Sequence, residues 1–379
     1  MPGPLDGVVV TELAGLGPAP FCGMLLADLG AEVVKVDRIG GTQLPIGSTE
    51  SDVLNRGKSS IAVDLKSPGG VEVVLRTVAR SDVLIEGFRP GVAERLGIGP
   101  AECLARKPSL VYARMTGWGQ TGPMADMAGH DIDYVALSGA LHSIGPSERP
   151  VPPLNLVADF GGGGMLLALG VLAALHHAGA TGEGQVVDAA MVDGSALLMA
   201  SHHGYLADGW WQPERESNLL DGAAPFYTTY ETADGAHMAV GALEPQFFSA
   251  LLRGLDIDPG VMGDQHDRER WSEMRDIFAT RFATRTRDEW ADHFAGSDAC
   301  VAPVLSMVEA PRHSHNKERE TFLTVAGVTQ PAPAPRFSST PTEIGGPPPL
   351  VGEDTEAVAV AAGFSRDEIG KLRESGAIA

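Results

Sequence analysis

The sequence predicts an α/β protein with a Rossmann-like large domain, built on a parallel sheet, and a smaller α+β domain. Short Val-rich segments alternate with helical segments through the first half of the chain. The pattern changes near Thr228, where turn residues at 230–235 precede another strand. Prolines crowd 330–350, which predicts an extended strap. Together these observations indicate two folded parts followed by a returning segment.

Each element follows from local pattern. In the first half, apolar runs rich in β-branched residues predict buried strands over 7–13, 32–37, 60–64, 83–86, 110–115 and 185–190. Helices are expected over 20–29, 69–79, 100–105, from the glycines at 161–164 to about 177, and over 192–208. The second part shows a strand over 237–241 and helices over 246–254, 268–283 and 287–295. A capping box from Ser365 to Glu368 opens the last helix.

These elements divide the chain into four stretches. The large domain is expected over 1–209, a polar linker over 210–227 and the small domain over 228–306. The strap and two short helices occupy 307–379. Because the three cysteines, Cys22, Cys103 and Cys300, are few and far apart, neither a disulfide framework nor a cysteine-rich zinc site is expected.

Composition narrows the partners. Of the 379 residues, 44% are hydrophobic and 20% are charged, which is typical of a folded globular protein. The net charge of −21 argues against nucleic acid, which needs a basic surface. No basic residue precedes Lys35, and the longest apolar run, 165–175, is shorter than a bilayer requires. We therefore expect a cytoplasmic protein that does not enter the membrane.

Two nucleotide motifs are incomplete. Gly15 and Gly17 follow the first strand, but Pro20 replaces the third glycine of a dinucleotide fingerprint. A phosphate-loop ending is visible at Lys58, yet Asp52 stands where that motif needs its first glycine. A tight turn is favoured for the first motif. The second is either a plain loop or a basic loop near a nucleotide's phosphates.

Three polar segments in apolar surroundings carry the chemistry. Their titratable residues are His130, Asp159 and Glu244. A histidine and carboxylates in a buried framework suit proton transfer, although each alone could be a packed or capping residue. Asp159 makes the sharpest case, because it comes just before the glycines that open a helix, where unpaired backbone N–H groups are expected.

Across nearly its whole length the chain resembles the α-methylacyl-CoA racemases, within the family III CoA-transferase superfamily. The matching segments are 33–38 (VVKVDR), 81–86 (SDVLIE), 112–120 (YARMTGWGQ), 129–131 (GHD), 153–156 (PLNL), 184–189 (GQVVDA), 218–222 (NLLDG) and 244–247 (EPQF). The resemblance implies an interlocked homodimer whose large domain binds CoA and whose small domain forms the other wall of the active site. It implies that 307–379 packs on the large domain. No metal or other cofactor is implied, because the acyl-CoA thioester is itself the substrate.

The implied reaction inverts the 2-methyl centre of an acyl-CoA by two-base proton transfer through an enolate. The family's acid–base pair corresponds to His130 and Asp159, with Glu244 partnering the histidine. Burial is expected to raise the pKa of Asp159. Supporting positions are Asp131, Asn155 and Gly161, and the backbone at 159–161 is expected to supply hydrogen bonds to the enolate oxygen. Five cations are expected near the CoA adenine and phosphates: Arg38, Arg56, Lys58, Arg89 and Arg95.

Two other functions compete. A CoA-transferase of the same superfamily would use Asp159 as a nucleophile. Such enzymes carry a glycine-rich loop in the small domain, whereas this chain reads AVGALE over 239–244. A catalytically silent CoA-binding scaffold would bind CoA without proton exchange, but it would not need all three titratable residues.

Overall fold

The computed structural model describes residues 3–41 and 47–379, and the chain divides into two compact units. Unit 1 comprises Met1–Ser138, Leu154–Met199 and Glu318–Ala379, and unit 2 comprises Gly139–Pro153 and Ala200–Lys317. These boundaries differ from the expected 1–209 and 228–306. The chain enters unit 2 twice, first as a short excursion at 139–153, which no local composition change announces.

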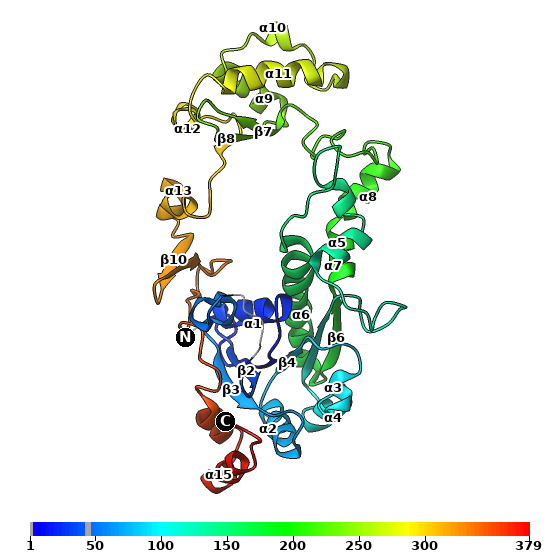
Figure 1. The fold of residues 1–379 in the computed structure, drawn as a ribbon, viewed down its shortest axis with the longest axis vertical. Helices are drawn as coiled ribbons and strands as arrows, with labels where there is room; N and C mark the ends of the chain where they lie inside the picture. The colour runs from blue at the N-terminus through cyan, green and yellow to red at the C-terminus, as the bar shows by residue number, and fades with distance from the viewer. Residues whose placement is uncertain (1–2, 42–46) are drawn as a thin grey trace. The chain divides into compact units, whose positions relative to one another are not determined.

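A six-stranded parallel sheet forms the centre of unit 1 (Figure 1). Its strands are β1 (Val9–Leu13), β2 (Glu32–Arg38), β3 (Ser59–Val63), β4 (Val83–Glu86), β5 (Val111–Thr116) and β6 (Gln185–Ala190). The order β3-β2-β1-β4-β5-β6 is that of the doubly wound nucleotide-binding fold. All six expected strands are present. Central strands such as β4 are buried at every residue, which explains their uninterrupted apolar sequence.

Helices cover both faces of this sheet. One layer holds α1 (Pro18–Asp28) and α6 (Leu166–Thr181), and the other holds α2 (Pro68–Ala79), α4 (Pro100–Arg106) and α14 (Thr355–Ala361). Proline in the first turn opens α1, α2 and α4, as its fixed backbone angle favours. Short helices α3 (Val92–Arg95) and α15 (Arg366–Glu374) complete that side, and the expected capping box of α15 is present, with Ser365 N donating to Glu368 Oε2 at 2.8 Å.

The expected helix over 192–208 is interrupted. It is two helices, α7 (Met191–Leu198) and α8 (Ala200–Ala207), and the break at Met199 is where the chain passes from unit 1 to unit 2. The 307–379 segment also holds more than a strap and two helices. Helix α13 (Ser314–Glu318) and an antiparallel hairpin of β10 (Phe322–Val325) and β11 (Val328–Pro331) precede the extended prolines.

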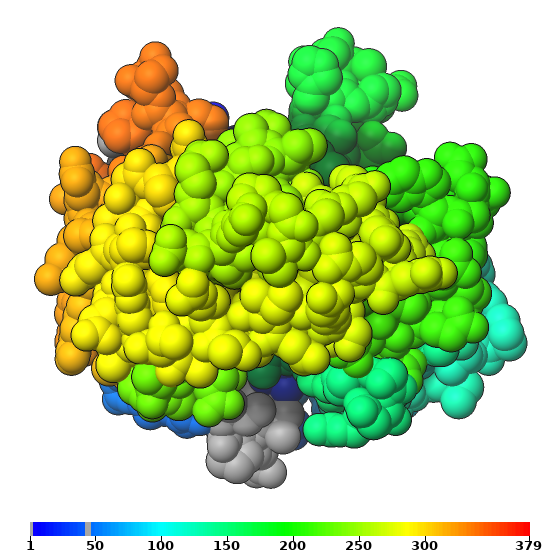
Figure 2. All heavy atoms as spheres, turned by 90° about the horizontal axis from the view of Figure 1, so that it is seen from above, coloured from blue at the N-terminus to red at the C-terminus, as the bar shows by residue number. Residues whose placement is uncertain are grey.

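Unit 2 is built on a three-stranded antiparallel sheet. Its strands are β7 (Tyr227–Glu231), β8 (His237–Gly241) and β9 (Val301–Pro303), in the order β7-β8-β9. Helices α9 (Pro245–Gly254), α10 (Pro259–Met262), α11 (Trp271–Phe282) and α12 (Arg287–Phe294) accompany it. The core of this unit is aromatic, with Phe226, Phe278 and Phe282 fully buried. Figure 2 shows one face of this unit, where residues of α10, α11 and neighbouring segments form a continuous surface.

One helix has the length and composition of a membrane span. It runs over Leu156–Thr181, and its most apolar stretch of 18 residues has a mean hydropathy of 1.8 and is 39% buried. The first ten residues are a π-helix that continues directly into α6. The apolar stretch is therefore longer than the run at 165–175 suggested. Its inner side chains, including Leu167 and Val171, pack into unit 1.

Candidate active site

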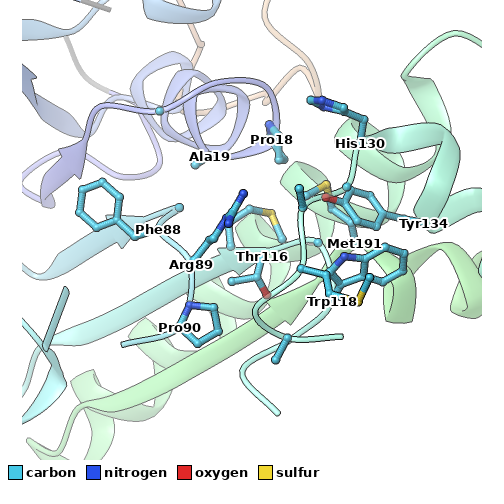
Figure 3. A pocket seen from close by; sticks show the side chains of 18 of the residues that line it. Pro18, Ala19, Phe88, Arg89, Pro90, Thr116, Trp118, His130, Tyr134 and Met191 are labelled. Carbon is cyan, nitrogen blue, oxygen red and sulfur yellow. The ribbon is translucent and has the colours of Figure 1, made fainter. Parts of the chain in front are cut away.

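A cavity of about 310 Å³ opens at the carboxyl edge of the large sheet, at the loops that follow β1, β4 and β5. Between β1 and β4 the strand order reverses, and doubly wound sheets bind their ligands at this point. Figure 3 shows Phe88 and Arg89 from the loop after β4 on one side and His130, Tyr134 and Trp118 on the other. The histidine expected from sequence therefore lies at a pocket of the kind that holds a nucleotide-like substrate.

His130 is placed by the start of a helix. It is the residue before α5 (Asp131–Leu137), and its backbone N–H donates to the side chain of Asp133 at 2.9 Å. This bond closes the first turn and fixes the backbone from which the imidazole projects. The side chain is exposed and lines the cavity.

Asp131 joins the histidine segment to the helix that carries Asp159. Its Oδ2 accepts hydrogen bonds from the backbone N–H groups of Ala158 and Asp159, both at 2.8 Å. The residue is only 6% exposed, and its Oδ1 has no partner among the described residues. One carboxylate thus sets the spacing between the two expected acid–base residues. Asp131, which the resemblance implies as a supporting residue, therefore holds the backbone of Asp159 in place.

Asp159 lies in the π-helix Leu156–Met165. Its Oδ2 accepts a hydrogen bond from Asn155 Nδ2 at 3.1 Å, so the expected support from Asn155 is present as a contact. Burial raises the pKa of Asp159, the bond from Asn155 opposes that rise, and the negative charge of Asp131 adds to it. The direction agrees with the expectation from sequence. The positive form of His130 acts on the same carboxylate and lowers its pKa.

The expected position of Asp159 before a helix start is wrong. The helix begins at Leu156, so Asp159 and Gly161 lie inside it. The backbone N–H of Asp159 is already taken by Asp131 and is not free for an enolate oxygen. This hydrogen bond could not be predicted from local sequence, because Asp131 and Asp159 are 28 positions apart in the chain.

The glycines after Asp159 permit close helix packing. A Cβ on Gly162 would lie 2.6 Å from the backbone nitrogen of Ser195 in α7. A Cβ on Gly164 would lie 2.7 Å from the carbonyl oxygen of Pro18 in α1. Both distances are shorter than side chains tolerate, so these glycines let α1, α7 and the π-helix meet. They set the place of Asp159 through packing rather than by contacting a ligand.

Two of the five expected CoA-binding cations are engaged elsewhere. Arg56 pairs with Asp28 at 2.6 Å, and Lys58 pairs with Glu12 at 2.7 Å; all four side chains are 4% exposed or less. Lys58 also donates to the carbonyl oxygen of Pro20 in the first turn of α1. Neither cation is free to hold a phosphate, because a buried charge needs the partner it already has.

The other three cations are accessible. Arg38 ends β2, Arg89 follows β4 and lines the cavity, and Arg95 ends α3; all three are exposed. Within residues 3–41 and 47–379 none of them forms an ion pair. They are the cations of the original five that a phosphate can reach.

Glu244 belongs to unit 2. It is the N-cap residue of α9, directly before Pro245, and it is exposed. The backbone beside it is fixed by Gln265, whose Nε2 donates to the carbonyl oxygens of Ala242 and Leu243. Because Glu244 and His130 belong to different units, their pairing stays a prediction.

Sequence reasoning missed several cavity residues. Tyr134 and Met191 line the cavity but lay in none of the quoted motifs, and Trp118 lay in the matching segment 112–120 without being singled out. Tyr134 had a weak signal, because it lies in the helix that begins directly after His130. Within the described ranges, no group of three or more His, Cys, Asp or Glu side chains is arranged to hold a metal ion.

Comparison with known proteins places the chain in a family. The model of the CoA-transferase family III matches residues 5–355. The chain belongs to this family. It is 50% identical to the mouse alpha-methylacyl-CoA racemase over 371 residues, which cover 97% of this chain and 96% of that protein. Identity to the human alpha-methylacyl-CoA racemase is 48% with the same coverage.

Members of the family named as transferases are also similar. The succinyl-CoA–D-citramalate CoA-transferase of Chloroflexus aurantiacus is 32% identical, with 98% of this chain and 97% of that protein covered. Among solved structures, a CAIB/BAIF family protein from Brucella suis superposes with a TM-score of 0.82 at 27% identity, covering 96% of this chain and 100% of that one. The fold of this chain is therefore that of the CAIB/BAIF proteins.

Proposed function

We propose that this protein is an α-methylacyl-CoA racemase, which inverts the 2-methyl centre of acyl-CoA thioesters. One observation carries the proposal: the Asp131 carboxylate ties Asp159 to the segment of His130, beside a cavity at the switch point of the sheet. The relatives named racemases are also more similar to this chain than those named CoA-transferases. A CoA thioester is the expected substrate of a family III member.

The proposed chemistry is a proton transfer on two faces. One member of the pair His130 and Asp159 takes the α-proton, and the thioester becomes an enolate. The other member returns a proton to the opposite face, so the proton count of the substrate is unchanged. For the other epimer the two roles exchange. The raised pKa of Asp159 suits this exchange, because it brings the carboxyl closer to the range in which a histidine titrates.

A CoA-transferase is the second candidate, because Asp159 is a half-buried carboxylate of the kind that can attack a thioester. The two functions separate in one assay. Purified protein is incubated with (2R)-2-methylacyl-CoA, with and without a free carboxylic acid, and the acyl epimers and CoA esters are resolved chromatographically. The racemase predicts the 2S epimer without the acid. CoA transfer to the acid, with no 2S product, would assign the protein to the transferases.

We also propose that the chain works as an interlocked homodimer. The continuous helix over Leu156–Thr181, which contains Asp159, leaves Met165 58% and Leu169 63% exposed, and Leu197 of neighbouring α7 is 60% exposed. A second copy of the chain is favoured as their cover, because the resemblance implies an interlocked pair. The net charge of −21 argues only against a membrane as the alternative cover. A strongly acidic surface is repelled by anionic lipid.

The assembly is tested by sedimentation of the wild type and of Leu169→Asp. A dimer that the substitution weakens supports the proposal. A wild-type monomer at micromolar concentration, or protein that sediments with vesicles, would contradict it.

Glu244→Gln tests the proposed pairing of Glu244 with His130. The substitution should slow epimerisation with less effect on CoA binding, and an unchanged pH–rate profile would count against that pairing.

A further inference from the structure

Formation of an enolate demands a hydrogen-bond donor for the thioester oxygen, and one of the backbone donors expected at 159–161 is engaged. The N–H of Asp159 donates to Asp131 at 2.8 Å. Negative charge that develops on an oxygen in a water-poor site is stabilised mainly by donors already in place. The proposed reaction therefore calls for a donor other than the N–H of Asp159.

Tyr134 lies where such a donor is needed. It is in α5, the helix that begins directly after His130. Both line the cavity (Figure 3). The residue as a whole is only 5% exposed, and its ring packs edge-on against Trp118 with 4.6 Å between ring centroids. These contacts hold the ring in one orientation.

Two glycines make room for the hydroxyl end of this ring. A Cβ on Gly117 would lie 2.2 Å from the phenol oxygen, and a Cβ on Gly129 would lie 3.0 Å from it. Both glycines also line the cavity. Any other residue at Gly117 would push the hydroxyl out of its place. The loop after β5 and the segment before His130 thus form a slot around this oxygen.

The hydroxyl of Tyr134 has no hydrogen-bond partner within the part of the chain that the structure describes. The other buried tyrosines differ. Tyr112 donates to the carbonyl oxygen of Ile98 at 2.9 Å, and Tyr230 donates to that of Pro225 at 2.5 Å. The hydroxyl of Tyr134 is not sealed in the core but accessible from the cavity that its residue lines. An unpartnered donor at a cavity is available to a ligand.

We propose that the hydroxyl of Tyr134 donates a hydrogen bond to the thioester oxygen of the substrate and stabilises the enolate. This inference rests on the proposed racemase function and adds a catalytic residue to it. The phenol keeps its proton throughout: it is a donor, not a third base. The α-proton still passes only between the substrate, His130 and Asp159.

The electrostatic surroundings keep the phenol protonated. Burial and the carboxylate of Asp159 raise the pKa of Tyr134 to about 12. Asp133 and Asp131 act in the same direction, and Arg89 acts against them. At neutral pH the group is therefore a neutral donor. It can respond to developing negative charge on the substrate without changing its own protonation state.

The test compares Tyr134→Phe with Tyr112→Phe. Each substitution removes the phenol oxygen of a buried tyrosine in unit 1, but only the first removes it from the cavity. For Tyr134→Phe, kcat for epimerisation should fall by about 10²–10³-fold, the effect typical of losing one such donor, and KM should rise by a much smaller factor, because the bond is strongest in the enolate. For Tyr112→Phe, kcat should stay near the wild-type value even if thermal stability falls.

Binding to two probes separates a donor from a structural residue. The probes are an acyl-CoA and its thioether analogue, which lacks the carbonyl oxygen. The wild type should bind the thioester more tightly, and Tyr134→Phe should lose that preference. Equal weakening of both probes by Tyr134→Phe would overturn the inference, because it would show a packing role.

A fluorinated tyrosine at position 134 gives a second readout. It retains the size of the ring but lowers the pKa of the phenol, so epimerisation should acquire a new loss of activity at alkaline pH. An unshifted alkaline limb would contradict the proposal. If the wild type itself fails to epimerise, the racemase assignment fails. If the wild type epimerises and Tyr134→Phe is as active as the wild type, the racemase assignment holds and this inference fails.

Discussion

Asp131 offers the most demanding test of the site geometry. Asp131→Ala removes an acceptor of two backbone hydrogen bonds, from Ala158 and Asp159, both at 2.8 Å. A buried donor left without a partner costs about 1–3 kcal/mol. Because Asp159 is only half-buried, the loss of both hydrogen bonds should lower the free energy of unfolding by about 2–4 kcal/mol.

The epimerisation rate of Asp131→Ala should fall by more than its loss of stability alone explains, because Asp159 loses its fixed distance from His130. A misplacement of about 1 Å can lower a rate by about 10²-fold. The assays are thermal or urea unfolding together with epimerisation kinetics at a temperature at which the variant is folded. Wild-type stability with wild-type kcat would refute the assigned role of Asp131.

Asp131→Asn isolates the charge from the geometry. The amide oxygen still accepts from both N–H groups, but the negative charge that raises the pKa of Asp159 is gone. The pKa of Asp159 should therefore fall, and the limb of the pH–rate profile that reports this carboxyl should move to lower pH. An identical profile for wild type and Asp131→Asn would show that this charge does not act on Asp159.

The remaining predictions concern the acid–base pair and the cations. His130→Ala and Asp159→Ala should each abolish epimerisation and leave CoA affinity, measured by calorimetry, largely intact; full activity in either would refute the two-base mechanism. Asp159→Asn should raise the melting temperature at neutral pH and lose this gain in acid. Because the pKa of Asp159 is raised in the folded state, the ionised carboxyl destabilises the fold at neutral pH, and the neutral amide removes this cost. In acid the carboxyl of the wild type is already protonated, so the substitution brings no gain there. An equal gain in acid would contradict this reasoning. Arg89→Ala should raise KM for the CoA ester, whereas Arg56→Ala should lower stability by about 3–5 kcal/mol with no selective effect on KM. The reverse pattern would mean that the buried cation binds the substrate.

Strong local patterns made most of the fold predictable. The strands of the large sheet came out within two residues of their expected bounds, because parallel strands buried on both faces read as continuous apolar runs. Features that depend on distant residues were missed. The helix over 192–208 breaks at Met199 although its apolar pattern continues through the break, and the excursion at 139–153 joins unit 2 without a local signal.

The candidate site was predictable in its residue types and less so in its contacts. His130 lies at the cavity, and Asn155 and Asp131 both contact Asp159 or its backbone. The environment of the cations was not predictable, because Arg56 meets its partner Asp28 only through the fold. A count of charges cannot separate a buried ion pair from a free phosphate ligand.

The early appearance of deuterium in the product epimer tests the central claim most directly. The wild type is mixed with (2R)-2-methylacyl-CoA in D₂O without any acceptor acid and is followed by NMR. We predict that the 2S epimer forms with deuterium at its α-carbon, because the returning proton comes from a group that exchanges with solvent. A protein that binds the ester but forms neither the 2S epimer nor any α-deuterated species would contradict proton transfer by His130 and Asp159.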